Sequence, residues 1–466
     1  MTQSDMIPLF DTASHVPVAT SCSYPARPGN LVRPLVDGVP TFRRIAEAIT
    51  DAQHSLWLTV AFYADDFRFP DNGETLFDTL DHAVARGLDV RVLFWRPNQQ
   101  SSGYGRTFSG TGADLEILRT RGTQFNIRWD QAHAAFCQHQ KSWIMDAGHA
   151  GETSFIGGIN LTAKALGLPG HRDGGQHDLY VEVAGPSATD VHHNFVQRWN
   201  EASERGKADG LWGPQGAATL PFPSRTSEPR GSSVVQIQRM VHPGRYAESH
   251  PTPGGLRQDI SRGERSILEQ YEQAIDAARS SIYIENQAVP IPAVARRLES
   301  ALQRGVEVVV LVPAEPETST DAARRSLSEI ELFNCLEALS HYENFALVGL
   351  IVSMERNTRA IYVHAKAMLV DDTWATIGSC NLHSNSLGGG TEMNASIWDP
   401  LVARRLRCEL LTEHLDKDTS ALDDRAALRL FQETAEHNRS VMKGFNAEWQ
   451  GLVVSLEASE YGRRIA

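Results

Sequence analysis

The motif His-x-Lys-x-x-x-x-Asp occurs twice in this chain of 466 residues, at positions 139–146 and 364–371. Its fixed residues are His139, Lys141 and Asp146 in the first copy and His364, Lys366 and Asp371 in the second. Each copy is followed by a turn of small residues that ends in an asparagine, Asn160 or Asn381. Two copies of one half-site predict a single composite active site.

Histidine and lysine two positions apart in an extended strand lie on the same face, so one phosphate can contact both. An imidazole with an ordinary pKa of roughly 6.5 can act near neutral pH as an uncharged nucleophile or as a protonated acid. Lysine stays cationic and donates hydrogen bonds to phosphoryl oxygens. With the amides of Asn160 and Asn381, the two motifs supply the groups for cleaving a phosphodiester through a phosphohistidine.

The second copy and its turn, residues 361–381, closely resemble the phospholipase D superfamily, and the spacing from Asp371 to the Gly-Ser-x-Asn turn matches that family without a gap. In the first copy a longer connection follows Asp146, and Gly158 stands where the family usually has the serine that occurs here as Ser379. The resemblance implies a phosphate-binding set made of Gly158, Asn160, Ser379 and Asn381. A serine contact is expected only on the second side.

The same resemblance gives each histidine an acidic partner downstream of its turn. The partner is Asp178 in the first half and Glu392 in the second. A carboxylate fixes the tautomer of a catalytic histidine and balances its charge. We therefore expect Asp178 to orient His139 and Glu392 to orient His364.

The resemblance also divides the roles of the two motifs. It makes His139 the nucleophile and His364 the general acid, while the two lysines hold the phosphoryl oxygens. The motif aspartates, Asp146 and Asp371, are not expected to contact substrate. Five positions from lysine, each falls on the opposite strand face and is expected to fix the local backbone.

Similarity between the halves extends beyond the motifs. Residues 48–58 align with residues 274–284, and both segments are expected to form a helix that leads into a strand. In each half helical periodicity alternates with β-branched runs such as 90–94 and 308–312, the pattern of an α/β lobe. We predict two similar α/β lobes, each a mixed sheet flanked by helices. The family resemblance implies a pseudo-twofold axis with the active site at the lobe interface.

The chain is divided at a Gly-rich and Pro-rich stretch. We place the N-terminal lobe with the first motif at 1–205, an interlobe linker at 206–232 and the C-terminal lobe with the second motif at 233–466. Residues 399–450 show helical spacing of apolar residues and are expected to form amphipathic helix.

Composition restricts the class of partner. The formal net charge of −13 counts against a general nucleic-acid binder, which usually presents a basic surface.

Three sequence features concern localisation and cofactors. Residues 1–6 lack the features of a secretory signal, and no apolar run is long enough to cross a bilayer. The five cysteines have neither the spacing of a disulfide framework nor that of metal ligands. We expect a cytoplasmic monomer that requires no metal or other cofactor.

The segment 178–199 resembles the corresponding block of plant and bacterial phospholipases D. The expected function is therefore hydrolysis of glycerophospholipid headgroups to phosphatidic acid, with transient contact at a membrane surface or micelle. If an alcohol replaces water in the second step, the same chemistry exchanges the headgroup. Two alternatives remain open: a nucleic-acid phosphodiesterase, and a phosphatidyltransferase of the cardiolipin or phosphatidylserine synthase type. The lack of N-terminal membrane spans counts against the cardiolipin case.

Overall fold

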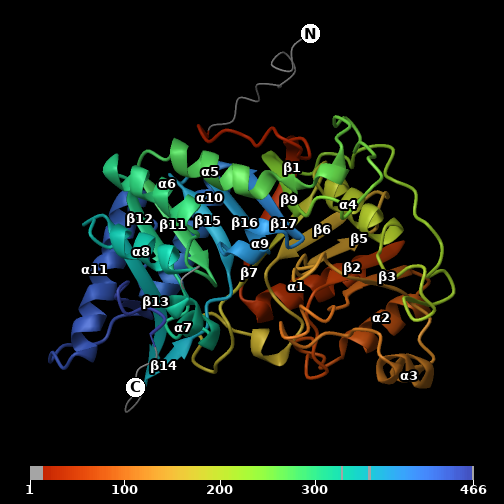
Figure 1. Ribbon diagram of the computed structural model, residues 1–466, viewed down its shortest axis with the longest axis horizontal. Helices are drawn as coiled ribbons and strands as arrows, with labels where there is room; N and C mark the ends of the chain where they lie inside the picture. The colour runs from red at the N-terminus through yellow and green to blue at the C-terminus, as the bar shows by residue number, and fades with distance from the viewer. Residues whose placement is uncertain (1–13, 327–328, 355–357, 464–466) are drawn as a thin grey trace, which may run out of the picture.

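A computed structural model describes residues 14–326, 329–354 and 358–463 (Figure 1). The first half of the chain, coloured red to yellow, lies on the right of the view and the second half, green to blue, on the left. The two expected helix-to-strand units are present. Helix α1 (Gly38–Asp51) leads into β2 (Ser55–Val60), and α5 (Ser266–Ala277) leads into β11 (Ser281–Asn286).

The sheet of the first lobe has the strand order β8-β4-β3-β2-β5-β6-β7-β1. Strands β2, β3 and β4 are mutually parallel, and the remaining pairs are antiparallel. Beside β2, its strands are β1 (Arg27–Val36), β3 (Asp89–Trp95), β4 (Asn126–Asp130), β5 (Ser142–Met145), β6 (Thr153–Gly157), β7 (Leu179–Ala184) and β8 (Leu211–Trp212).

The sheet of the second lobe repeats this order as β13-β12-β11-β15-β16-β17-β9, with β14 and β18 beside β13 and β10 beside β9. Its strands beside β11 are β9 (Ser233–Val241), β10 (Glu264–Arg265), β12 (Glu307–Leu311), β13 (Phe345–Ser353), β14 (Thr358–Ile361), β15 (Lys366–Val370), β16 (Trp374–Gly378), β17 (Glu392–Trp398) and β18 (Val453–Ser455). The equivalent strands β1 and β9 also pair antiparallel with each other, which joins the two sheets. This arrangement confirms the predicted duplication about an approximate twofold axis.

Most strands are buried on both faces. Helices cover the outer face of each sheet, and on the inner side the two sheets meet in part while the helices at 188–200, 400–415 and 424–442 cover the rest. In β2, Leu56 and Leu58 pack into the outer core of the first lobe, whereas Trp57 packs into a central core that both lobes share. Inward-facing residues of β7 and β16, such as Val181 and Ile377, meet in that central core. The other helices are α2 (Leu76–Ala85), α3 (Gly112–Arg121), α4 (Ala188–Asn200), α6 (Pro292–Gln303), α7 (Thr318–Arg325), α8 (Ile330–Leu339), α9 (Ser384–Gly388), α10 (Pro400–Leu415) and α11 (Asp424–Met442).

Two segments differ from the expected lobe bounds. Residues in the segment 14–26 lie against the second lobe, where the Val16 carbonyl accepts a 2.7 Å hydrogen bond from the Trp398 indole. Strand β8, inside the expected linker, pairs with β4 of the first sheet. Glycine and proline content reveals where the chain turns, but it does not reveal what the turning segment packs against.

Three further expectations concern the surroundings of the protein. Within the described ranges, no helix combines the length and apolar character needed to cross a membrane. All five cysteines have free thiols. Residues 1–6, on which the expected lack of a secretory signal depends, lie outside the described part of the chain.

The motif aspartates fix backbone, as predicted. The Asp146 carboxylate accepts hydrogen bonds from the amides of residues 53–55, with the bond from His54 at 2.6 Å. Asp371 does the same for residues 279–281, each at 2.8 Å. In both lobes this carboxylate ties the end of the motif strand to the start of the neighbouring antiparallel strand, which is β2 in the first lobe and β11 in the second.

We expect Asp146→Ala to lower the free energy of unfolding by roughly 2–4 kcal/mol, because three backbone amides lose a charged acceptor. The measurement is urea denaturation of the full chain. Asp51→Ala, which changes an exposed aspartate just before this amide cluster, should stay within about 0.5 kcal/mol of the unmodified protein. Equal effects of the two substitutions would contradict the anchoring role of Asp146.

Candidate active site

The four motif histidines and lysines lie at equivalent places in the two lobes. His139 and Lys141 directly precede β5, while His364 precedes β15 and Lys366 begins it. All four side chains are buried. The two motifs are brought together at the interface between the lobes, as the repeated half-site predicted.

Short backbone pairings across the interface hold the two motifs in place. The His139 amide donates to the Thr391 carbonyl at 2.9 Å, and Gln138 and Thr391 form a parallel bridge. In the reciprocal contact the His364 amide donates to the His177 carbonyl at 2.7 Å. The chain segment just before each acid therefore pairs with the motif of the other lobe.

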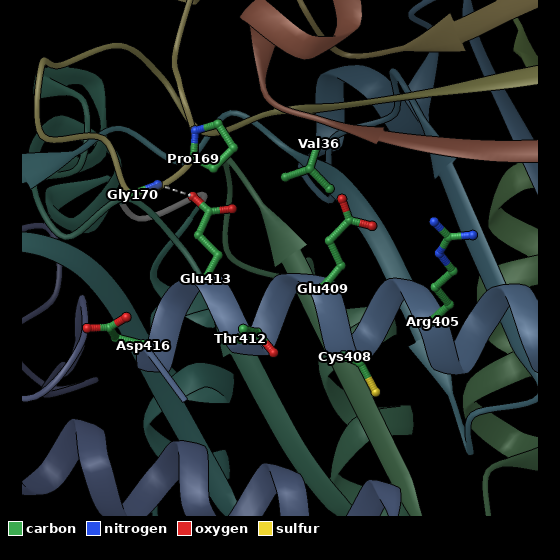
Figure 2. A pocket seen from close by; sticks show the side chains of 9 residues that line it. All are labelled: Val36, Pro169, Gly170, Arg405, Cys408, Glu409, Thr412, Glu413 and Asp416. Atoms are coloured by element: carbon green, nitrogen blue, oxygen red, sulfur yellow. Dashed lines mark hydrogen bonds between the residues drawn. The ribbon is translucent and has the colours of Figure 1, made fainter. Parts of the chain in front are cut away.

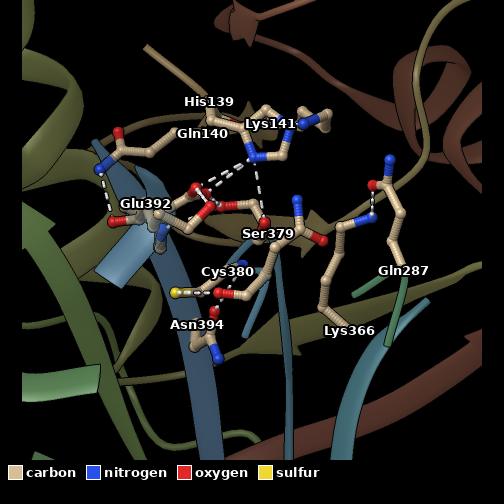
Figure 3. Close-up of polar contacts among 12 residues, drawn as sticks. His139, Gln140, Lys141, Gln287, Lys366, Ser379, Cys380, Glu392 and Asn394 are labelled. Atoms are coloured by element: carbon tan, nitrogen blue, oxygen red, sulfur yellow. Dashed lines mark hydrogen bonds and ion pairs between the residues drawn. The ribbon is translucent and has the colours of Figure 1, made fainter. Parts of the chain in front are cut away.

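The acidic partners are crossed relative to the prediction. His139 Nδ1 lies 2.9 Å from Glu392 Oε2 (Figure 3), and His364 Nδ1 lies 2.5 Å from Asp178 Oδ2. The expectation that Asp178 orients His139 and that Glu392 orients His364 is wrong. Both acids are correctly identified, but each serves the histidine of the opposite lobe because the preceding residue is paired across the interface.

These contacts define the tautomer of each imidazole. His139 Nδ1 also lies 3.0 Å from the carbonyl oxygen of Ser379, so both of its neighbours are acceptors. The proton of neutral His139 is therefore on Nδ1, which leaves the Nε2 lone pair free. The carboxylate of Asp178 imposes the same tautomer on His364.

The two carboxylates have different surroundings. Glu392 accepts hydrogen bonds of 2.5 Å from the hydroxyls of Ser379 and Ser386. Burial raises the pKa of Glu392, but His139, Lys141 and the Ser379 hydroxyl together bring it below its usual value. Asp178 accepts from the Leu179 amide at 2.8 Å, and burial raises its pKa to about 6. The carboxylate behind His139 is therefore the more firmly ionised of the two.

Gly158 stands in the first turn where the family usually has serine, and this difference has a steric cause. A Cβ atom at Gly158 would lie 2.4 Å from Asp178 Oδ1, so the acid occupies the space that a side chain would need. On the other side Ser379 fits and donates to Glu392. In this structure the Ser379 hydroxyl therefore positions the acid. A direct contact of Gly158 or Ser379 with substrate stays a prediction.

Both lysines are buried cations with spare donors. Lys141 Nζ donates to the His139 carbonyl at 2.9 Å, and burial lowers its pKa to about 8. Lys366 Nζ donates to the His364 carbonyl and lies 3.3 Å from Gln287 Oε1 (Figure 3), and burial lowers its pKa to about 7. Each ammonium keeps at least one N–H that can be used by a bound phosphate.

The turn asparagines also have unused polar atoms. The Oδ1 atoms of Asn160 and Asn381 are buried and have no hydrogen-bond partner among the described residues. An amide oxygen accepts hydrogen bonds, so a phosphoryl oxygen would have to be bound by the Nδ2 group of each side chain. The predicted role of Asn160 and Asn381 in substrate binding stays a prediction.

Two positioning residues were not among the predicted site residues. Gln287 contacts Lys366, and its amide donates to the Tyr362 hydroxyl at 2.8 Å. Ser386 holds Glu392 from the short helix α9. The polar residues at the end of β11, which begin at Glu285, are a signal for Gln287. Nothing local distinguishes Ser386 from other serines.

Comparison with known proteins agrees with this geometry. A family model described as "Cardiolipin synthase, PLD-like domain" matches residues 45–199 and 271–413, which is more than half of the chain. A second model, "Phospholipase D", matches residues 170–290. The chain is 24% identical to the major cardiolipin synthase ClsA of Bacillus subtilis over 81% of this chain and 67% of that protein. It is also 24% identical to cardiolipin synthase A of Pseudomonas entomophila, over 88% of this chain and 74% of that protein.

Among solved structures, the crystal structure of phosphatidylserine synthase from Haemophilus influenzae Rd KW20 superimposes with a TM-score of 0.54 at 13% identity. The match covers 88% of this chain and 94% of that one, and it shows a shared fold. The family model that matches both halves of the chain leads to one assignment: the protein is an enzyme of the phospholipase D superfamily.

Proposed function

We propose that this protein is a phosphatidyltransferase, which moves a phosphatidyl group from a glycerophospholipid to an alcohol through a phosphohistidine. The observation that carries this proposal is the reciprocal pair of catalytic histidines, each held by a carboxylate of the opposite lobe. The cardiolipin synthases among its relatives favour transfer to an alcohol over the hydrolysis expected from the sequence.

In the first step His139 Nε2 attacks phosphorus. A P–N bond forms, and the P–O bond to the departing alcohol breaks. His364 donates its Nε2 proton to the oxygen that leaves. Glu392 stabilises the positive charge that develops on His139, which agrees with the lowered pKa of this acid and with its two hydroxyl donors. The choice of His139 as nucleophile is part of the proposal.

His364 must be protonated before this step. In the free protein its pKa lies well below the usual value because of burial and the nearby cations Lys366 and Lys141. An anionic phosphodiester bound to both ammonium groups offsets their field at His364. Substrate binding is therefore expected to raise the pKa of His364, so that its imidazole is protonated when the alcohol oxygen leaves.

In the second step His364 removes a proton from the acceptor hydroxyl. The acceptor oxygen bonds to phosphorus, the P–N bond breaks, and His139 returns to its neutral state. If water is the acceptor, the product is phosphatidic acid and the reaction is that of a phospholipase D. Transferase and hydrolase thus share one site and differ in the acceptor admitted after the first alcohol has left.

The first test supplies phosphatidylglycerol vesicles to the full chain and measures cardiolipin and phosphatidic acid side by side. We expect cardiolipin to be the major product, and we expect His139→Gln to reduce its rate by roughly a thousandfold or more. A matched control is His192→Gln, since His192 is a buried histidine paired with Glu152 at 2.9 Å, outside the site. If phosphatidic acid is the only product, the protein is a phospholipase D and the proposed transferase activity is wrong. Cleavage of single-stranded DNA without lipid turnover would contradict both.

The second test identifies the nucleophile with a nitrophenyl phosphodiester, whose leaving group needs no general acid. In His364→Gln the covalent adduct should form on His139 and accumulate, because the base for the second step is missing. Mass spectrometry of the quenched protein locates the adduct. An adduct on His364 in the His139→Gln variant would reverse the two roles.

A further inference from the structure

A second group of ionisable side chains, three of them buried and Glu413 half-buried, lies directly behind the catalytic site. Asp37, His171, His177 and Glu413 each offer one ligand atom, and these atoms lie within 4.8 Å of one another. Asp37 ends the turn after β1, the two histidines belong to the loop before β7, and Glu413 comes from α10 of the second lobe. The cluster therefore spans the lobe interface.

Two of the distances between the donor atoms match those around a small cation. His171 Nε2 lies 3.2 Å from Asp37 Oδ2 and 3.4 Å from Glu413 Oε1. Ligand atoms in a tetrahedral zinc site are about 3.3 Å apart, because the metal–ligand bonds are roughly 2.0–2.1 Å long. The same spacing is long for a charge-assisted hydrogen bond, which is usually about 2.7–2.9 Å.

Several of these atoms are buried without a hydrogen-bond partner. Both ring nitrogens of His171 and the Oδ2 atom of Asp37 make no aligned hydrogen bond among the described residues. The side chains of His171 and Asp37 are 0% exposed. Leaving such groups unsatisfied is costly, and native proteins rarely do so without a ligand.

His177 has the environment of a metal-bound histidine. Its Nδ1 atom faces Asp37 at 3.0 Å, while its Nε2 atom lies 3.0 Å from Glu285 Oε2. A carboxylate on the far nitrogen fixes the tautomer and orients the ring of a histidine ligand. Glu285 is a buried acid within β11 and has no place in the reaction proposed above.

An ion could reach the cluster from a surface cavity of about 630 Å³ that Glu413 and Gly170 help to line (Figure 2). In this view Glu413 projects from α10 toward the loop of Pro169 and Gly170, and it accepts a 2.9 Å hydrogen bond from the Gly170 amide. A metal site needs such an entry path.

We propose that Asp37, His171, His177 and Glu413 bind a first-row divalent cation, with Zn²⁺ suited to the two imidazoles and two carboxylates. The ion holds the first-lobe loop before β7 against α10 of the second lobe. It takes no part in the phosphoryl chemistry. The ion affects catalysis only by positioning Asp178, the acid that holds His364. It does so through Asp37, whose backbone amide donates a 2.8 Å hydrogen bond to the carbonyl of Asp178.

The test incubates the full chain with ZnCl₂, removes unbound metal by desalting and measures the bound zinc by inductively coupled plasma mass spectrometry. We expect about one equivalent of zinc per chain, and at least a tenfold lower content in His171→Gln and in Glu413→Gln. His192→Gln, which alters a buried histidine–carboxylate pair outside the cluster, should retain the full equivalent.

A second measurement starts from the unmodified chain, whose folding is not in question. Zn²⁺ added to chelator-treated protein should raise the melting temperature, because the ion binds the folded chain. The same addition should leave the melting temperature of His171→Gln unchanged. If the unmodified chain retains no more zinc than His171→Gln and shows no thermal shift, the cluster is a proton-bound network and the metal site is refuted.

Discussion

The structure depends on two reciprocal backbone contacts between the lobes. Residues 177 and 391, each just before an acid, pair with the motif of the opposite lobe. This pairing places each carboxylate beside the other lobe's histidine and makes neither lobe complete alone. The composite site is therefore a consequence of strand pairing at the interface, and any change that separates the lobes removes both histidine–acid pairs together.

Burial gives this site its chemical character. Two lysines, two histidines and two acids are taken out of water, and this is tolerable because each has a partner and because the charges of the set nearly balance. Burial lowers the pKa of both Lys141 and Lys366. A bound phosphodiester would offset part of this effect, since its anion neutralises the cations that, together with burial, lower the pKa of His364.

The sequence was sufficient for the duplication, the α/β lobes and the backbone role of Asp146 and Asp371, because periodicity and repeated spacing are local signals. The partner of each histidine was not predictable in the same way. Spacing along the chain identified Asp178 and Glu392, but which histidine each one meets depends on a contact between the lobes. The cluster around His171 was missed for the same reason, since its ligands come from three distant segments.

The crossed pairing can be tested by proton NMR of the imidazole Nδ1–H groups in protein labelled with ¹⁵N-histidine. Each resonance is assigned by substituting its own histidine. The account predicts that Asp178→Asn shifts the signal of His364 and leaves that of His139 in place, and that Glu392→Gln does the reverse. A shift of His139 alone on Asp178→Asn would show that each acid serves the histidine of its own lobe and would contradict the account.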